Sequence, residues 1–145
     1  MLKGISPVIS PELLKILDEM GHGDELVIGD CNYPAVSTSK QCIRADGISL
    51  ECLLKAILEL FPLDHGEEHP AVTMMAPTKS DNYKGDPEIW NAIRNAITAS
   101  DREAYIVSID RFKFYEAAKQ TYVAISSGEK KPYGCVILRK GIVSN

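Results

Sequence analysis

The chain has 145 residues, of which 45% are hydrophobic and 25% charged, and its 16 basic and 20 acidic side chains give a formal net charge of −4. A chain of this length and composition buries roughly two-thirds of its surface, so its fold needs no disulfide or metal for stability. The acidic balance offers no positive field to phosphate backbones or anionic lipid, which argues against nucleic acid and membrane partners.

Signals for export, membrane insertion and cofactor binding are absent from the sequence. No segment approaches the roughly 20 apolar residues that span a bilayer, and the first residues lack the basic start of an export signal. The fingerprints of dinucleotide sites, P-loops and nucleophile elbows are missing. The four cysteines are scattered without a Cys-x-x-Cys pair. We therefore expect a cytoplasmic protein with reduced thiols, no metal and no cofactor.

Helical and strand patterns alternate along the chain. Ser10 and Pro11 suit the start of a helix, and Pro62 ends another because it cannot continue the hydrogen-bond ladder. Helical periodicity predicts helices over residues 10–20, 49–61, 86–97 and 112–119. Short apolar or β-branched runs predict strands over residues 26–28, 71–76, 104–109, 122–126 and 135–139.

This alternation predicts one domain, residues 1–145, with a three-layer α/β sandwich fold and a mixed, mostly parallel sheet. Gly128 and Pro132 separate the last two strands and favour a hairpin-like return, which places an antiparallel strand at the edge of the sheet. Ligands of such sheets collect outside the carboxyl ends of the strands. Polar residues that follow strands are therefore candidate site residues.

Three positions stand out, each with a simpler structural alternative. His22 lies between two glycines after a helix, where it fits either a ligand contact or a cap on the last helical carbonyls. Asp30 follows an apolar strand and fits either a binding role or an Asx-turn. The pair Asp110 and Arg111 follows another strand and fits either a binding role or a surface ion pair.

Two further features have structural interpretations. The segment from Asp64 to Pro70 contains two histidines four residues apart among carboxylates, but Gly66 and Pro70 argue against a helix that would align them. We interpret it as a solvated loop rather than a metal site. Three tyrosines fit core or interface packing, or a wall on which a sugar ring stacks: Tyr115, Tyr122 and Tyr133.

Several motifs, in the same order along nearly the whole chain, resemble the fucose branch of the fucose mutarotase and ribose pyranase family. Gly23 after the histidine and Tyr33-Pro34 after the strand aspartate resemble this branch rather than the ribose branch. The similar segments are 20–25, 30–35, 43–47, 109–116, 127–129 and 133–141.

The resemblance implies an isomerase that interconverts the α and β anomers of a reducing sugar, with L-fucose favoured. It implies His22 as the proton donor and acceptor. The sugar would be held by Asp30, Arg111 and the segment Tyr133, Gly134 and Cys135. A nearby carboxylate, Asp24 or Asp30, would orient the imidazole, and water or Tyr133 would carry the second proton.

The resemblance leaves several alternatives open. The family commonly has asparagine where this chain has Cys135, so a side-chain hydrogen bond to the sugar is lost there unless the contact uses the backbone. Family members form ring-shaped oligomers, commonly decamers, with a site completed by a neighbouring subunit, which implies a homo-oligomer here. A pyranose/furanose interconversion of ribose and a non-catalytic sugar-binding role in transport remain as alternative functions.

Overall fold

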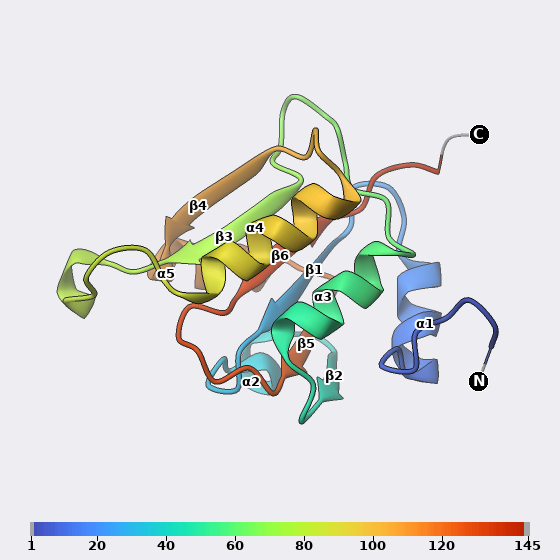
Figure 1. Ribbon diagram of the computed structural model, residues 1–145, viewed down its shortest axis with the longest axis horizontal. Coiled ribbons are helices and arrows are strands. Elements are labelled where there is room, and N and C mark those ends of the chain that lie inside the picture. The colour runs from blue at the N-terminus through green and yellow to red at the C-terminus, as the bar shows by residue number, and fades with distance from the viewer. Residues whose placement is uncertain (1, 144–145) are drawn as a thin grey trace.

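In the computed structural model, which describes residues 2–143, six strands form one sheet with helices packed on both faces (Figure 1). The strands are β1 (Glu25–Gly29), β2 (Cys42–Ala45), β3 (Val72–Ala76), β4 (Ile106–Asp110), β5 (Val123–Ser127) and β6 (Val136–Arg139). The helices are α1 (Pro11–Glu19), α2 (Ala35–Thr38), α3 (Leu50–Leu58), α4 (Ile89–Ser100) and α5 (Arg111–Ala118), with a 3₁₀ turn η1 (Lys79–Asp81).

The strand order is β2-β5-β1-β6-β3-β4. Strand β6 is antiparallel to both of its neighbours, β1 and β3, whereas the other neighbouring pairs are parallel. The mixed, mostly parallel α/β fold is confirmed, but the expected edge position of the antiparallel strand is wrong. The expected hairpin is also wrong, because β1 lies between β5 and β6. Val136, Ile137 and Leu138 are almost fully buried, and burial on both faces favours the middle of a sheet over its edge.

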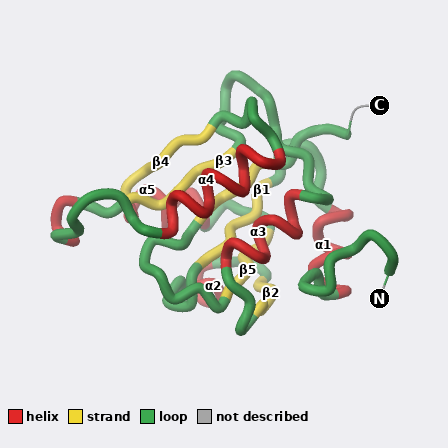
Figure 2. The backbone as a smooth tube through the Cα atoms, in the orientation of Figure 1, coloured by secondary structure: helices red, strands yellow, loops and turns green. Residues whose placement is uncertain are grey.

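Alternating side chains along the strands divide the core into two layers. Leu26 and Ile28 of β1 pack with α1, α3 and α4, whereas Val27 faces α2 and α5 on the other side. Figure 2 shows α3 and α4 crossing the near face of the sheet. Within residues 2–143, no helix has both the length and the apolar character needed to cross a membrane.

Local sequence signals account for most of these elements. The hydroxyl of Ser10 accepts the N–H of Leu13 at 3.1 Å and begins α1. The carboxylate of Asp110 accepts the N–H of Phe112 at 3.1 Å and begins α5. Asp110 is thus a helix cap, and no ion pair joins it to Arg111 among the described contacts. Strand β2 was not predicted: of its four residues two are only partly buried and one is exposed, so their apolar pattern is weak.

The direction of the strands makes the two rows of strand ends chemically distinct. The five parallel strands all end in one row, which we call the carboxyl edge, and β6 begins there because it runs the opposite way. Segments that precede the parallel strands, and the segment that follows β6, lie at the other edge, the amino edge. In Figure 1, β1 starts on the side of the molecule where both termini lie and runs away from it.

A close backbone contact completes the amino edge. Leu63 forms a bridge with Lys140, the N–H of Gly141 donates to the carbonyl of Pro62 at 2.8 Å, and the N–H of Asp64 donates to the carbonyl of Arg139 at 3.0 Å. A Cβ atom on Gly141 would lie 2.7 Å from the carbonyl carbon of Leu63. Because that neighbour is backbone, it cannot rotate away as a flexible side chain would.

We therefore predict that Gly141→Ala lowers the free energy of unfolding by about 1–3 kcal/mol, the usual cost of overpacking. Urea unfolding followed by circular dichroism measures this. Gly21→Ala is the matched control, since its Cβ would lie 3.7 Å from a carboxylate oxygen of Asp24, and it should change the free energy by no more than about 0.5 kcal/mol. Equal unfolding midpoints for the two variants would show that the contact at Gly141 is unimportant.

Candidate functional site

The predicted site residues divide between the two edges of the sheet. Asp30 follows β1, Arg111 follows β4 and residues 133–135 precede β6, so these lie at the carboxyl edge, whereas His22 precedes β1 and lies at the amino edge. The five residues of β1 separate the edges by roughly 16 Å, because a strand rises about 3.3 Å per residue. Within one chain, His22 is therefore out of reach of the other predicted residues.

The carboxyl edge contains a pocket of about 180 Å³, which we call the Asp30 pocket. Small-molecule pockets typically measure about 300–1,000 Å³, so this one suits a single small ring. Its lining contains the predicted Asp30, Arg111, Tyr133 and Cys135. Tyr115, a candidate wall for a sugar ring, also lines it. Four further lining residues were not predicted for the site: Asn32, Tyr33, Met75 and Pro132.

Sequence position indicates several of these residues. Asn32 and Tyr33 directly follow Asp30, and Met75 lies at the end of β3, the same edge of the sheet. Tyr115 is four residues after Arg111 in α5, and residues four apart share one face of a helix. Residue type alone did not indicate a role in the site, because a methionine or tyrosine near a strand or helix normally belongs to the core.

Asp30 is almost buried, with 6% of its surface exposed. One carboxylate oxygen accepts the N–H of Asn32 at 2.9 Å, and the other lies 3.6 Å from the Sγ atom of Cys135. Burial raises the pKa of Asp30, although these donors favour its charged form. The Asx-turn and the binding role are therefore compatible, because the same carboxylate makes the turn and lines the pocket.

The segment before β6 approaches Asp30 closely. A Cβ atom on Gly134 would lie 3.4 Å from the Cβ of Asp30 and 3.2 Å from the carbonyl oxygen of Lys131, so the space suits glycine. Tyr133 has a left-handed backbone with φ of 63° and packs edge-on against Tyr83, with ring centroids 5.0 Å apart. The buried thiol of Cys135 lies beside the same carboxylate.

Arg111 pairs with a residue that the sequence did not indicate. Its Nη2 donates to Oδ1 of Asp81 at 2.8 Å, and its Nε donates to Oδ2 at 3.4 Å. The Asp81 carboxylate raises the pKa of Arg111, and Tyr115 acts in the same direction. A guanidinium held along one edge keeps its remaining N–H groups for other acceptors.

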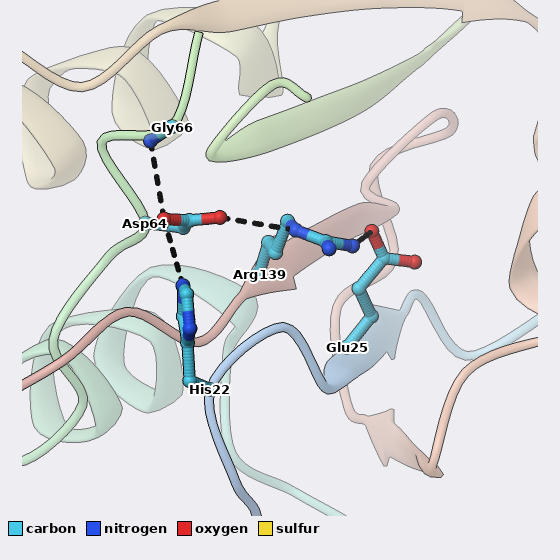
Figure 3. A network of polar contacts seen from close by, with 5 residues as sticks. All are labelled: His22, Glu25, Asp64, Gly66 and Arg139. Carbon is cyan, nitrogen blue, oxygen red and sulfur yellow. Dashed lines mark hydrogen bonds and ion pairs between the residues drawn. The ribbon is translucent and has the colours of Figure 1, made fainter. Parts of the chain in front are cut away.

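His22 belongs to a second network at the amino edge, shown in Figure 3. Its imidazole is 61% exposed, and Nε2 lies 3.4 Å from Oδ1 of Asp64. Neither expected orienting residue takes this place: Asp24 accepts the N–H of Gly21 at 2.7 Å, and Asp30 lies at the opposite edge. Asp64 is therefore the carboxylate that orients the imidazole.

The expected cap role of His22 is filled by another residue. The ammonium group of Lys140 donates to the carbonyl of Leu17 at 2.6 Å, at the end of α1, where a cation is favoured by the helix dipole. The backbone of Lys140 also accepts the N–H of Gly23 at 2.8 Å. The backbone of Lys140, just after β6, thus holds the loop that carries His22, and the imidazole takes no part in capping α1.

Asp64 is held in place from several sides. Its Oδ1 accepts the N–H of Gly66 at 3.1 Å and its Oδ2 accepts Nε of Arg139 at 3.1 Å. Arg139 in turn pairs with Glu25 at 3.2 Å, as Figure 3 shows. Burial alone would raise the pKa of Asp64, but the bonds from Gly66, His22 and Arg139 outweigh it and lower that pKa. The orienting carboxylate therefore stays ionised near neutral pH.

His22 opens into a hollow of about 650 Å³, which we call the His22 hollow. The loop from Asp64 to His69 lines it together with Arg139 and Ile142. Among residues 2–143 no group of three or more His, Cys, Asp or Glu side chains is arranged to hold a metal ion. His65 instead pairs with Asp101 at 2.7 Å.

The two edges offer complementary chemistry. The Asp30 pocket presents a carboxylate acceptor, a forked guanidinium donor and phenols, groups that bind a neutral ring rich in hydroxyls. The amino edge presents an exposed imidazole beside a fixed carboxylate, an arrangement that moves protons in either direction.

Several solved structures are similar to this chain over nearly its whole length. Fucose mutarotase from Streptococcus pneumoniae, in complex with L-fucose, is 40% identical, with a TM-score of 0.89 over 99% of this chain and 100% of that chain. FucU from Bifidobacterium longum is 44% identical, with a TM-score of 0.90 over 98% and 100%. RbsD from Bacillus subtilis, complexed with D-ribose, shares the fold at 20% identity, with a TM-score of 0.73 over 99% and 100%.

A family model gives the same result from the sequence. The model for the RbsD / FucU transport protein family matches residues 3–143, nearly the full length of the chain. The expected resemblance is therefore confirmed at the level of the family, and the chain belongs to the RbsD / FucU transport protein family.

Proposed function

We propose that this protein is a mutarotase that interconverts the α and β anomers of L-fucose. The observation that carries the proposal is the Asp30 pocket, where a buried carboxylate, a guanidinium fork and a phenol surround a space for one sugar ring. The 40% identity to a fucose mutarotase that binds L-fucose supports this substrate.

Proton transfer is the catalysis that this reaction needs. Anomer exchange opens the ring at the anomeric carbon, rotates the aldehyde and closes the ring on its other face. The ring oxygen gains a proton as it leaves, and the anomeric hydroxyl loses one. A group that both donates and accepts protons near neutral pH serves both directions, and imidazole is such a group.

His22 is the proposed proton carrier, with Asp64 as the residue that orients it. Nδ1 of the imidazole has no partner among the described hydrogen bonds, whereas Nε2 lies beside Asp64. Tyr133 or Tyr115, both of which line the Asp30 pocket, is available for the second proton. Burial raises the pKa of Tyr133, and the Asp81 charge acts in the same direction, so this phenol retains its proton at neutral pH.

The distance between His22 and the Asp30 pocket calls for a second copy of the chain. A head-to-tail contact would place the amino edge of one subunit against the carboxyl edge of the next, and such contacts generate a closed ring when the rotation between subunits closes. This agrees with the ring, commonly a decamer, that the resemblance implies. In this arrangement, His22 from one subunit completes the pocket of its neighbour.

Exposed apolar side chains beside both parts of the site support this contact. Phe112, next to Arg111, is 57% exposed, and Tyr83, which packs on Tyr133, is 36% exposed. Ile142, which lines the His22 hollow, is 67% exposed. Apolar and aromatic groups of this kind are enriched in the buried centres of subunit interfaces.

The apolar part of the Asp30 pocket favours a deoxy sugar. Met75, Tyr33 and Pro132 lie in its lining beside the polar groups. The C5 methyl group of L-fucose would pack on such a wall, and one methyl group is worth about 10–200-fold in discrimination. Ribose lacks this group, so pyranose/furanose interconversion of ribose is the weaker alternative.

The cytoplasmic location follows from the sequence-based prediction and is part of this proposal.

We predict that His22→Ala slows anomer exchange of L-fucose by about 10²–10⁴-fold, the usual contribution of a positioned acid–base group. Saturation-transfer NMR between the α and β anomer signals measures the rate. His69→Ala is the matched control, because His69 lines the same hollow and should leave the rate unchanged.

Two outcomes would count against the proposal. Wild-type exchange rates in His22→Ala would remove His22 from the mechanism. Binding of fucose without any acceleration of exchange by the wild-type protein would favour the alternative of a non-catalytic sugar-binding protein in transport.

Binding should also depend on the ionisation of Asp30. Burial raises its pKa, and a charged carboxylate accepts stronger hydrogen bonds from hydroxyls than a neutral one. We therefore predict that acidification weakens fucose binding with a midpoint above about 3.9, the value of an unperturbed aspartate. Titration calorimetry in the His22→Ala background removes the imidazole from the measurement. Asp30→Asn should bind more weakly at neutral pH and show no such midpoint, and a pH-independent affinity in the parent would contradict the assignment.

A further inference from the structure

Asp81 contacts Arg111 of the Asp30 pocket without belonging to the lining of that pocket. It lies in η1, in the segment after β3 that projects from the body of the molecule in Figure 1. We propose that Asp81 is a positioning residue that fixes Arg111 in the orientation that binds the sugar, within a segment that also holds Tyr133 through Tyr83. This inference rests on the proposed mutarotase function and deepens it.

The first contact fixes the guanidinium of Arg111. Asp81 engages Nη2 and Nε along one edge of the group, at 2.8 and 3.4 Å, and its side chain is only 14% exposed. The ring of Phe112 lies 4.6 Å from the guanidinium carbon and restricts a face of the same group. A guanidinium held at one edge and one face presents its remaining N–H groups in a defined direction.

A second contact, from the same segment, concerns Tyr133. Burial raises the pKa of this phenol, and the negative charge of Asp81 acts in the same direction. The ring is also held edge-on by Tyr83, which lies two residues after Asp81. The turn that holds Arg111 thus also holds Tyr133, so both sugar-binding groups depend on one short segment.

The carboxylate of Asp81 is itself fixed by the backbone. Its Oδ2 accepts the N–H of Thr78 at 2.8 Å, and the Thr78 side chain completes a capping box with the N–H of Asp81. Arg111, together with this backbone donor, holds the pKa of Asp81 well below its usual range. The negative charge is therefore present throughout the pH range in which the protein would work.

Asp81 is outside both apolar core clusters, so its replacement should leave the sheet and helices intact. We predict that Asp81→Asn raises the KM for L-fucose about 10–100-fold, the range for loss of a charge-assisted hydrogen bond. Its kcat should stay within about threefold, because Arg111 binds the sugar and takes no part in proton transfer, while His22, the proposed proton carrier, is unchanged. Asp86→Asn removes the same charge from the same segment, where Asp86 is 73% exposed and 3.8 Å from Arg94, and should match the wild type.

A spectroscopic readout separates positioning from a general structural effect. With tyrosines labelled at Cζ and the Tyr133 signal assigned from Tyr133→Phe, the Tyr133 titration midpoint should move to lower pH in Asp81→Asn. It should not move in Asp86→Asn. This measurement needs no sugar and no activity.

The outcomes are distinct. An unchanged KM and an unchanged Tyr133 midpoint in Asp81→Asn, with active wild-type protein, overturn the inference and leave the proposed function intact. Absence of exchange by the wild type overturns the proposed function instead. If Asp81→Asn fails to fold, Asp81→Glu keeps the charge and displaces it by one methylene, and an unchanged KM in that variant also overturns the inference.

Discussion

The direction of one strand determines where the chemistry of this protein lies. Strand β1 places His22 before its first residue and Asp30 after its last, so the two most informative residues of the sequence lie at opposite edges of the sheet. Antiparallel β6 connects the same edges in reverse, with Tyr133 to Cys135 before it and Arg139 at its end.

An ion pair between a carboxylate and a guanidinium orients a functional side chain at each of the two edges. At the amino edge, Arg139 holds Asp64, and Asp64 lies beside the imidazole of His22. At the carboxyl edge, Asp81 holds Arg111, which lines the Asp30 pocket. The pair of Arg139 and Asp64 orients the exposed His22, and the pair of Asp81 and Arg111 orients Arg111 itself. Such pairs contribute orientation more reliably than net stability, because desolvation offsets much of their attraction.

The sequence predicted what depends on neighbours in the chain and missed what depends on distant ones. Caps such as Ser10 and Asp110 and the apolar runs of β1 and β3 are local signals, and they located most helices and strands. The position of β6 depends on pairing with β1 and β3, which no local pattern specifies. Asp64 lies 42 residues from His22, and Asp81 lies 30 from Arg111, so their roles appear only when the chain is folded. The resemblance indicated His22 and the pocket residues but not their separation within one chain.

In the proposed assembly, one subunit supplies His22 to the Asp30 pocket of another, and complementation between two impaired variants tests this arrangement. His22→Ala and Arg111→Ala chains, co-expressed with different tags, are isolated as mixed oligomers through both tags and assayed for fucose anomer exchange. Each variant alone should be impaired, and random mixing at a heterologous interface should restore about a quarter of the sites. Recovery of roughly that share of wild-type activity is the predicted result. Mixed oligomers no more active than the separate variants, or no oligomer carrying both tags, would rule out a site shared between subunits.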